Sequence, residues 1–429
     1  KVIYVPVPEN KETLMPDWDK LIAMYKAVYK LFDEGKVLSA SVVKEGGTAA
    51  SVCKACFGNG FGFKFANELT NDELFAPLSG SLVIELADGA ELSNDVLHYD
   101  LGTVTNDAKI TVNGKEIELS ALLEKWTAPL EKVFPTKAEV PEIEVDVPLY
   151  SERNTSSPAI KVAKPTVFIP VFPGTNCEVD TARAFEKAGA NVEMLIVKNL
   201  SSNDIEETID EMEKLIAKSQ MIMLPGGFSG GDEPDGSGKF IATTFRNPRI
   251  AEQVNNLLKN RDGLMLGICN GFQALIKLGL VPYGEIRELK ANDPTLTFNT
   301  IGRHISHMAY TRVTSVKSPW FANVNAGDVF AVPVSHGEGR FMADEATVKM
   351  LAENGQIATQ YVDLNGEPTM DLAYNPNSSM CAIEGIISPD GRVLGKMGHT
   401  ERISSDTCVN VDGNKEQLLF KGGVDYFRI

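Results

Sequence analysis

The sequence has little positive charge for its length. Lys and Arg number 41 against 58 Asp and Glu, which gives a formal net charge of −17 over 429 residues. Nucleic acids and anionic membranes are bound by clustered Lys and Arg, and the short basic stretch at 258–261 is soon followed by acid. We therefore expect neither a nucleic-acid partner nor a membrane partner.

Long apolar runs and closely spaced cysteines are also absent. No stretch reaches the roughly 18 apolar residues that a membrane span needs, and the opening Lys-Val-Ile-Tyr-Val has no signal-peptide pattern. The 6 cysteines are scattered, unlike the disulfide framework of a small secreted domain. The sequence predicts reduced thiols and a cytoplasmic protein, and its opening reads like the middle of a longer protein.

A metal site is not expected either. Cys53-Lys-Ala-Cys56 is a lone C-x-x-C, and the second ligand pair that a structural zinc site needs does not follow. The surrounding residues read as a helix with both thiols near one face, which favours core packing.

Two domains are predicted on either side of a connector. Residues 134–164 are rich in Pro and charge and keep no helical period, which is typical of an extended linker. The boundary is placed at 150–163, so the predicted parts are residues 1–150, a linker at 151–164, and residues 165–429. The first part mixes a helix at 21–32 with short strands and an Asn-Gly hairpin turn, which predicts a smaller α+β domain.

The second part alternates apolar strands with amphipathic helices. This alternation predicts an α/β domain with a doubly wound, mainly parallel sheet and helices on both faces. Ligands of such sheets bind beyond the carboxyl ends of the strands. Strands are expected at 166–172, 191–197, 221–224 and 263–268, with helices at 178–188, 202–217, 250–258 and 271–278.

Gly267-Ile-Cys-Asn-Gly271 stands between the last of these strands and its helix. This is the thiol version of a nucleophile elbow, in which flanking glycines allow a tight turn that holds Cys269 above the sheet. The helix N-terminus beneath the sulfur would favour the thiolate, and the backbone N–H of Asn270 is placed to bind an oxyanion. A buried structural cysteine is the alternative, but packing alone would not require the two glycines.

Two H-x-E pairs could supply a base for the thiol. His399 and Glu401 follow a strand at 392–397, and His336 and Glu338 follow another at 329–334. At a strand end this spacing puts the carboxylate on the side of the imidazole, where it can orient the ring. Spacing alone leaves both pairs open.

Six strings, in order, resemble the class I or triad glutamine amidotransferases. More narrowly, they are similar to the glutaminase domain of the formylglycinamide ribonucleotide amidotransferases of purine biosynthesis. They cover nearly all of residues 165–429, and they are Phe172-Pro-Gly-Thr-Asn-Cys-Glu178, Pro225-Gly-Gly-Phe-Ser-Gly-Gly-Asp232, Gly267-Ile-Cys-Asn-Gly-Phe-Gln273, Val334-Ser-His-Gly-Glu-Gly-Arg340, Asn375-Pro-Asn-Ser-Ser379 and Gly398-His-Thr-Glu-Arg402.

The resemblance implies a role for each matching residue. The triad becomes Cys269, His399 and Glu401, with His336 and Glu338 as second-rank candidates that line the site or a domain contact. Gly227 would share the oxyanion hole, and Gln273 and Asn299 would help to hold glutamine. After the histidine the sequence departs from the family pattern, because Thr400 stands where Pro is usual.

Residues 1–150 resemble, more weakly, the last part of the synthetase region, which is related to the aminoimidazole ribonucleotide synthetases. The resemblance implies that the chain itself lacks the ATP site and holds no cofactor. ATP and Mg²⁺ would belong to the complete enzyme, with the rest of the synthetase as partner and glutamine as substrate. The alternatives are a γ-glutamyl or peptide hydrolase on the same fold, or a docking module without catalysis.

Overall fold

The computed structural model describes all residues except 67, 140–144, 232–237 and 429. Contacts divide the described chain into two units, Lys1–Thr136 and Lys137–Ile429. None of the helices in these described parts combines the length and apolar character that a bilayer crossing requires.

The first unit is α+β, as predicted. Its strands are β1 (Val2–Val5), β2 (Val37–Val42), β3 (Gly62–Phe65), β4 (Leu82–Leu86), β5 (Tyr99–Thr105), β6 (Lys109–Val112) and β7 (Lys115–Glu118). Its helices are α1 (Trp18–Asp33), α2 (Gly47–Asn59), α3 (Asn71–Phe75) and α4 (Leu119–Thr127). The strands form one sheet in the order β2-β4-β1-β5-β3-β6-β7, in which the described pairs are antiparallel except for β3 with β6.

Helix α1 has two apolar faces. It begins after Asp17, whose carboxylate accepts a hydrogen bond from the Lys20 N–H as an N-cap. One face buries Met24, Val28 and Leu31 in the core of the first unit. The other face leaves large side chains exposed, namely Trp18, Ile22, Tyr25, Tyr29 and Phe32.

The second unit carries the α/β pattern. Its strands are β8 (Thr166–Val171), β9 (Asn191–Ile196), β10 (Met221–Leu224), β11 (Leu264–Ile268), β12 (Thr295–Phe298), β13 (Ile305–Val313), β14 (Val329–His336), β15 (Glu338–Met342), β16 (Ile357–Tyr361), β17 (Ile383–Ile387) and β18 (Val393–Lys396). Its α-helices are α5 (Glu178–Ala188), α6 (Ser202–Lys218), α7 (Lys239–Phe245), α8 (Pro248–Asn260), α9 (Asn270–Leu278), α10 (Leu280–Tyr283), α11 (Glu345–Glu353) and α12 (Leu419–Phe427). Short 3₁₀ helices are η1 (Ser229–Gly231), η2 (Pro319–Phe321), η3 (Met380–Ala382) and η4 (Thr400–Arg402).

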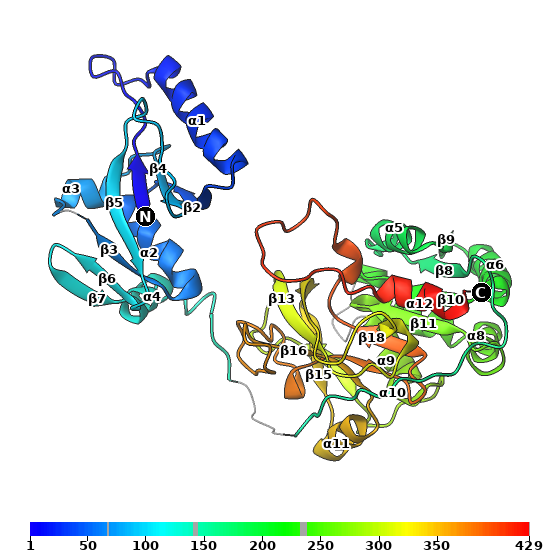
Figure 1. Cartoon of the computed structure of the whole chain (residues 1–429). Helices are drawn as coiled ribbons and strands as arrows, with labels where there is room; N and C mark the ends of the chain where they lie inside the picture. Colours follow the sequence, from blue (N-terminus) through cyan, green and yellow to red (C-terminus); the bar gives the residue numbers. More distant parts are fainter. Residues whose placement is uncertain (67, 140–144, 232–237, 429) are drawn as a thin grey trace. The chain divides into compact units, whose positions relative to one another are not determined.

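The main sheet of this unit is parallel in one half and antiparallel in the other. Over the described residues its order is β14-β13-β16-β17-β18-β11-β10-β8-β9, and the pairs from β18 to β9 are parallel. The chain moves outward from β8 to β9 and then back to β10, so right-handed crossovers place α5 on one face and α6 on the other. The predicted doubly wound α/β fold is confirmed, with an antiparallel extension beyond β18 (Figure 1).

Four parallel strands end at the same edge. The buried strands β10 and β11 are apolar throughout, as expected for strands covered on both faces. Their register pairs Leu224 with Gly267, and Ile268 with Lys396 of β18. The loops after β8, β10, β11 and β18 therefore meet beyond this edge.

The predicted linker at 151–164 packs against the second unit. The N–H of Asn154 donates to the carbonyl of Lys317 at 3.2 Å, and the guanidinium of Arg153 donates to the carbonyl of Phe321 at 2.8 Å. These bonds explain why the contact boundary falls at Thr136, well before the linker predicted from Pro and charge content.

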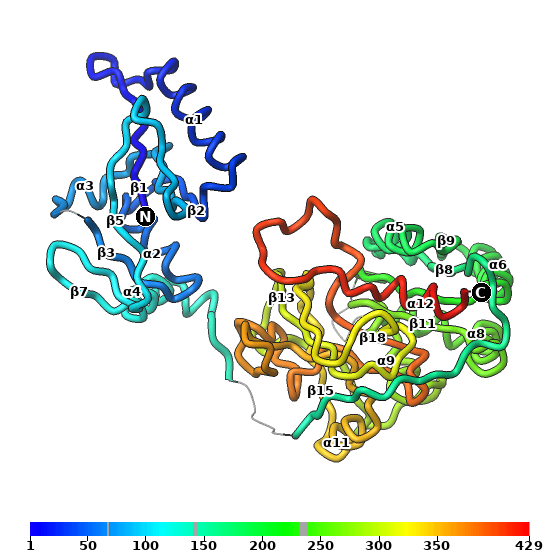
Figure 2. The backbone as a smooth tube through the Cα atoms, in the orientation of Figure 1, coloured from blue at the N-terminus to red at the C-terminus, as the bar shows by residue number. Residues whose placement is uncertain are grey.

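A long loop precedes the last helix of the chain. Residues 403–418 leave η4 as a loop and return to begin α12, which packs beside α5 (Figure 2). Gln417, at the end of this loop, is buried in the second unit.

Candidate active site

Cys269 stands at the turn between β11 and α9 with φ 51° and ψ −105°. Residues other than glycine rarely adopt a positive φ, and such strain is concentrated at functional sites. A Cβ on Gly271 would lie 1.9 Å from the carbonyl oxygen of Leu224, and a Cβ on Gly267 would lie 2.6 Å from Leu275 Cδ1. The turn has the strand–turn–helix geometry that the elbow pattern predicts, and only glycine fits on either side.

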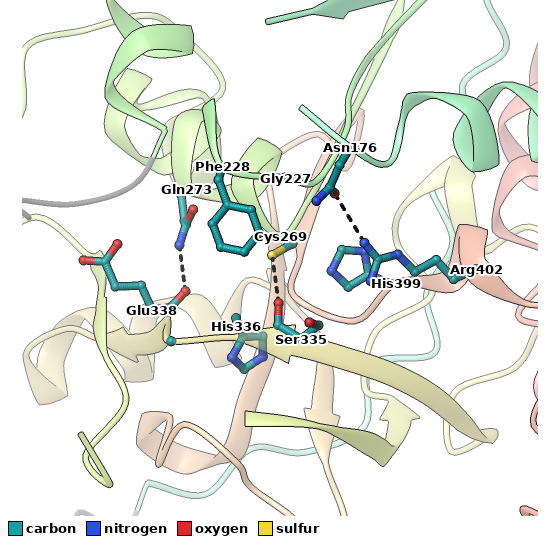
Figure 3. A pocket seen from close by; sticks show the side chains of 11 residues that line it. Asn176, Gly227, Phe228, Cys269, Gln273, Ser335, His336, Glu338, His399 and Arg402 are labelled. Atoms are coloured by element: carbon teal, nitrogen blue, oxygen red, sulfur yellow. Dashed lines mark hydrogen bonds between the residues drawn. The ribbon is translucent and has the colours of Figure 1, made fainter. Parts of the chain in front are cut away.

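Cys269 lies in a pocket of about 220 Å³ that the loops beyond the sheet edge enclose (Figure 3). The residues that line it are Asn176, Gly227, Phe228, Cys269, Gln273, Ser335, His336, Gly337, Glu338, His399 and Arg402. Three predicted site residues lie outside this lining, namely Asn270, Asn299 and Glu401.

The surroundings of Cys269 disfavour its thiolate. Burial raises its pKa above the usual range, and the nearby Cys177 and Glu401 add to the rise. The backbone N–H of Asn270 lowers the pKa but does not outweigh burial. Burial therefore opposes the thiolate that the helix N-terminus is expected to favour, because desolvation penalises the charged sulfur.

His399 and Glu401 are joined by a short hydrogen bond behind the pocket. His399 Nδ1 lies 2.6 Å from Glu401 Oε1, and both side chains are buried. Burial raises the pKa of Glu401, but His399, a backbone hydrogen bond and the charge of Arg402 together hold it below the ordinary value. Among the described residues, Nε2 of His399 has no hydrogen-bond partner. The carboxylate thus fixes the ring through Nδ1 and leaves Nε2 for chemistry.

The rival pair is built differently. His336 is buried, and neither of its ring nitrogens has a partner within the described chain. Burial lowers its pKa to about 3, so the ring stays neutral. No hydrogen bond joins the side chain of Glu338 to this ring. The backbone carbonyl of Glu338 instead accepts a hydrogen bond from Gln273 Nε2 at 2.7 Å. The geometry therefore favours His399, whose ring is oriented by a carboxylate.

The loop after β10 packs tightly on the loop after β8. Gly227 has φ +139° and pairs with Thr175 in an antiparallel bridge. A Cβ at Gly227 would lie 2.7 Å from the backbone N of Asn176, so a side chain is excluded. This close approach brings the backbone of Gly227 to the pocket wall beside Cys269 (Figure 3). Asp232, which closes the predicted string, lies outside the described residues.

Substitution of Gly226 by Ala is expected to lower kcat by about 10- to 100-fold, because small displacements of a catalytic group have effects of this size. The new Cβ would lie 2.6 Å from His399 Cε1 and 3.0 Å from Cys177 Sγ, so the imidazole must move. Gly337→Ala is the matched control, since that Cβ, also at the pocket wall, meets nothing closer than 3.8 Å. Initial rates of ammonia release measure both variants, and equal rates would contradict the packing argument.

A hydrogen-bonded chain forms one wall of the pocket. Asn270 Oδ1 accepts from the N–H of Ser229 at 3.2 Å, and its Nδ2 donates to Gln273 Oε1 at 3.0 Å. Gln273 continues the chain to Glu338. Asn299 stands behind this wall, where its Nδ2 donates to the carbonyl of His336 at 2.8 Å. The structure thus gives Asn299 a bracing position, and its predicted contact with glutamine stays a prediction.

Three residues that lie in the matching strings, but to which the sequence analysis assigned no role, gather at the other wall. The guanidinium of Arg402 donates to Cys177 Sγ at 2.9 Å and to Asn176 Oδ1 at 3.4 Å. Cys177 Sγ lies 3.8 Å from His399 Nδ1, and burial raises its pKa to about 12. The available signals were their presence in two of the six strings and the adjacency of Arg402 to Glu401. Cys177, His399 and Glu401 approach closely enough to share a metal ion, but their hydrogen bonds already engage these atoms.

Comparisons with known proteins identify the class. Residues 164–427 match the family described as the CobB/CobQ-like glutamine amidotransferase domain, and the chain belongs to this family. The resemblance carried by the six strings is confirmed, and the protein is an enzyme of the glutamine amidotransferase class.

More particular relatives carry the name phosphoribosylformylglycinamidine synthase subunit PurQ. The one from Methanococcus maripaludis strain C7 is 36% identical over 250 residues, which are 57% of this chain and 84% of the relative. The one from Aquifex aeolicus is 32% identical over 245 residues, 57% of this chain and 93% of the relative. A solved structure of PurLQS from Thermotoga maritima aligns with 62% of this chain and 100% of its own, at 24% identity and a TM-score of 0.45.

Proposed function

We propose that residues 165–429 hydrolyse glutamine with Cys269 as nucleophile, His399 as base and acid, and Glu401 as the group that orients the ring. The observation that carries this proposal is the convergence of two loops, the one after β11 and the one after β18. The elbow presents Cys269 to the same pocket that His399 lines, and the buried carboxylate of Glu401 holds the histidine from behind. Similarity to the PurQ subunits supports the same assignment.

In the first half-reaction the sulfur bonds to the δ-carbon of glutamine as the thiol proton passes to His399 Nε2. The backbone N–H groups of Gly227 and Asn270 stabilise the oxyanion that forms. The intermediate then collapses, the C–N bond breaks, and His399 returns the proton to the leaving nitrogen. Ammonia departs, and a glutamyl thioester remains on Cys269.

In the second half-reaction water cleaves the thioester. His399 removes a proton from water as its oxygen adds to the carbonyl carbon, and the same proton then reprotonates the sulfur. Glutamate leaves, and the thiol is again neutral. Only the neutral imidazole of His399 can accept the thiol proton at the start of each cycle.

The ammonia is proposed to serve the ATP-dependent conversion of formylglycinamide ribonucleotide to formylglycinamidine ribonucleotide in cytoplasmic purine biosynthesis. The PurQ relatives are named as subunits of that synthase. We propose that residues 1–150 are the end of the synthetase region and that the remaining synthetase holds ATP and Mg²⁺. The exposed apolar face of α1 supports a partner for the first unit.

The pocket size favours glutamine over the rival hydrolase substrates. At about 220 Å³ it is smaller than the roughly 300–1,000 Å³ of sites for drug-sized ligands. The test is a panel of glutamine against γ-glutamyl dipeptides, with the full chain as enzyme. We expect kcat/KM at least about 100-fold higher for glutamine, because a longer leaving group must displace packed wall residues. Equal values would indicate a γ-glutamyl hydrolase instead.

Labelling separates catalysis from a docking role. A chloroketone analogue of glutamine should alkylate Cys269 stoichiometrically, and excess glutamine should protect it. A chain that docks without catalysis would leave Cys269 unlabelled under the same conditions. Ammonia made without an acceptor is wasted, so slow turnover is expected when the synthetase is absent.

A further inference from the structure

A fully buried ion pair lies directly behind the catalytic histidine. Lys396 ends β18 and Glu384 lies on the neighbouring strand β17, and the side chains of both are 0% exposed. Lys396 Nζ and Glu384 Oε1 are 3.3 Å apart. Removing two charges from water costs more than their attraction returns unless further hydrogen bonds satisfy them. The partners that satisfy this pair are therefore informative.

Those partners belong to the loop that carries His399. Glu384 Oε1 accepts from the N–H of Gly398 at 2.5 Å. Lys396 Nζ donates to the carbonyl of Gly398 at 2.7 Å and to Thr400 Oγ1 at 3.1 Å. The pair thus holds both polar backbone atoms of the residue before His399 and the side chain of the residue after it.

The long C-terminal loop closes the arrangement. Thr400 Oγ1 donates to Gln417 Oε1 at 2.7 Å, so its hydroxyl both accepts from Lys396 and donates to Gln417. The carboxylate of Glu384 also accepts a hydrogen bond from Thr359 Oγ1. All of these hydrogen bonds join residues of the second unit.

Packing leaves the loop little room to shift. A Cβ on Gly398 would lie 2.8 Å from Val332 Cγ2, 3.0 Å from Glu384 Oε1 and 3.1 Å from Lys396 Nζ. The N–H of His399 itself donates to the carbonyl of Pro333 at 2.8 Å. The backbone around His399 is therefore held by packing against Val332, by the buried ion pair and by the carbonyl of Pro333.

We propose that Glu384, Lys396 and Thr400 form a loop clamp, a set of positioning residues that sets the place of the His399 imidazole relative to Cys269. None of the three lines the pocket, so they act through His399 and not by touching substrate. The inference rests on the proposed function, because it concerns the steps in which His399 moves a proton. Loss of the clamp should slow those steps and leave glutamine binding intact.

Thr400 offers the mildest test, because one hydroxyl can be removed at constant shape. T400V takes away the contacts with Lys396 and Gln417, whereas T400S keeps the hydroxyl. We expect T400V to lower kcat by about 10-fold, with KM for glutamine within about twofold of wild type, since misplacement of a base affects chemistry more than binding. T400S should restore kcat to within about threefold of wild type.

The double variant K396M/E384Q removes both charges without leaving either one buried alone. We expect about a 100-fold loss of kcat, because the ammonium group of Lys396 that donates to Gly398 and Thr400 is gone. R287M/D293N is the control, since it removes a partly buried pair, 3.1 Å apart, from a region outside the pocket lining. Its kcat should match wild type.

The decisive readout is the state of the enzyme during turnover. Intact-mass spectra after rapid quenching measure the fraction of chain that carries a glutamyl thioester. Clamp variants should accumulate thioester, and the pH dependence of kcat should shift, whereas a loss of folded protein would lower the rate without either change. Thermal melting gives the folded fraction of each variant.

Two outcomes would overturn the clamp. One is a folded T400V with wild-type kcat and no added thioester, and the other is an equal loss in T400S and T400V. If the double variant does not fold, the Thr400 pair still decides. The Cys269→Ala variant keeps the two proposals apart, because activity that survives it refutes the proposed function whatever the clamp variants do.

Discussion

Cys269→Ala is expected to abolish glutamine hydrolysis, with kcat lowered by at least about 10⁴-fold, as for other covalent nucleophiles. No other described thiol lines the pocket, so no second nucleophile can take over. Alanine also fits the space, since Cys269 is buried and the change only removes the sulfur. Ammonia release measures the rate, and intact mass after incubation with glutamine should show no added glutamyl group.

Cys408→Ser is the matched control for this variant. Cys408 is exposed in the loop before α12, so it competes for any thiol reagent but lies outside the pocket lining. Its loss should leave kcat and active-site labelling unchanged. Labelling by the glutamine chloroketone that persists in Cys269→Ala and disappears in Cys408→Ser would reverse the assignment of the nucleophile.

His399→Ala is expected to lower kcat by about 10²- to 10⁴-fold, the range for loss of a general acid–base group. Burial raises the pKa of Cys269, so without the imidazole the thiol loses its proton only to solvent hydroxide. The residual rate should therefore keep rising with pH above neutrality instead of reaching a plateau. The profile is measured as the stopped-flow rate of ammonia release at pH values from about 6 to about 10, which span the ordinary pKa values of His and Cys.

His336→Ala provides the comparison. Its ring is neutral and has no carboxylate beside it, so its removal should cost kcat far less and leave the shape of the pH profile unchanged. Thioester cleavage at wild-type speed in His399→Ala, with a large loss in His336→Ala, would make His336 the base.

The parallel half of the sheet and the elbow were predictable from the sequence because both depend on local patterns. Apolar strands such as β10 and β11 alternate with helices of ordinary length, and such segments can form only a covered parallel sheet. Gly267 and Gly271 flank Cys269 within five residues of chain. The choice between His399 and His336 needed the family resemblance, because their spacing to an acid is the same.

The antiparallel extension and the far wall of the pocket were not predictable in this way. Strands β13 and β16 are paired across the sheet with residues far away in sequence, and no local period encodes such partners. Arg402 and Cys177 meet only because β8 and β18 end at the same edge. The direction of the pKa shift of Cys269 also depends on burial, which the sequence alone does not give. The helix dipole by itself would lower this pKa, whereas burial raises it.

The burial that raises the pKa of Cys269 bears on oxidation of this thiol as well as on catalysis. Peroxide oxidises thiolates far faster than thiols, and sulfinic acids formed in this way are seldom repaired. A buried thiol with a raised pKa is therefore expected to react slowly with peroxide between turnovers. The same burial makes activation of the sulfur depend on a base, which is the role proposed for His399.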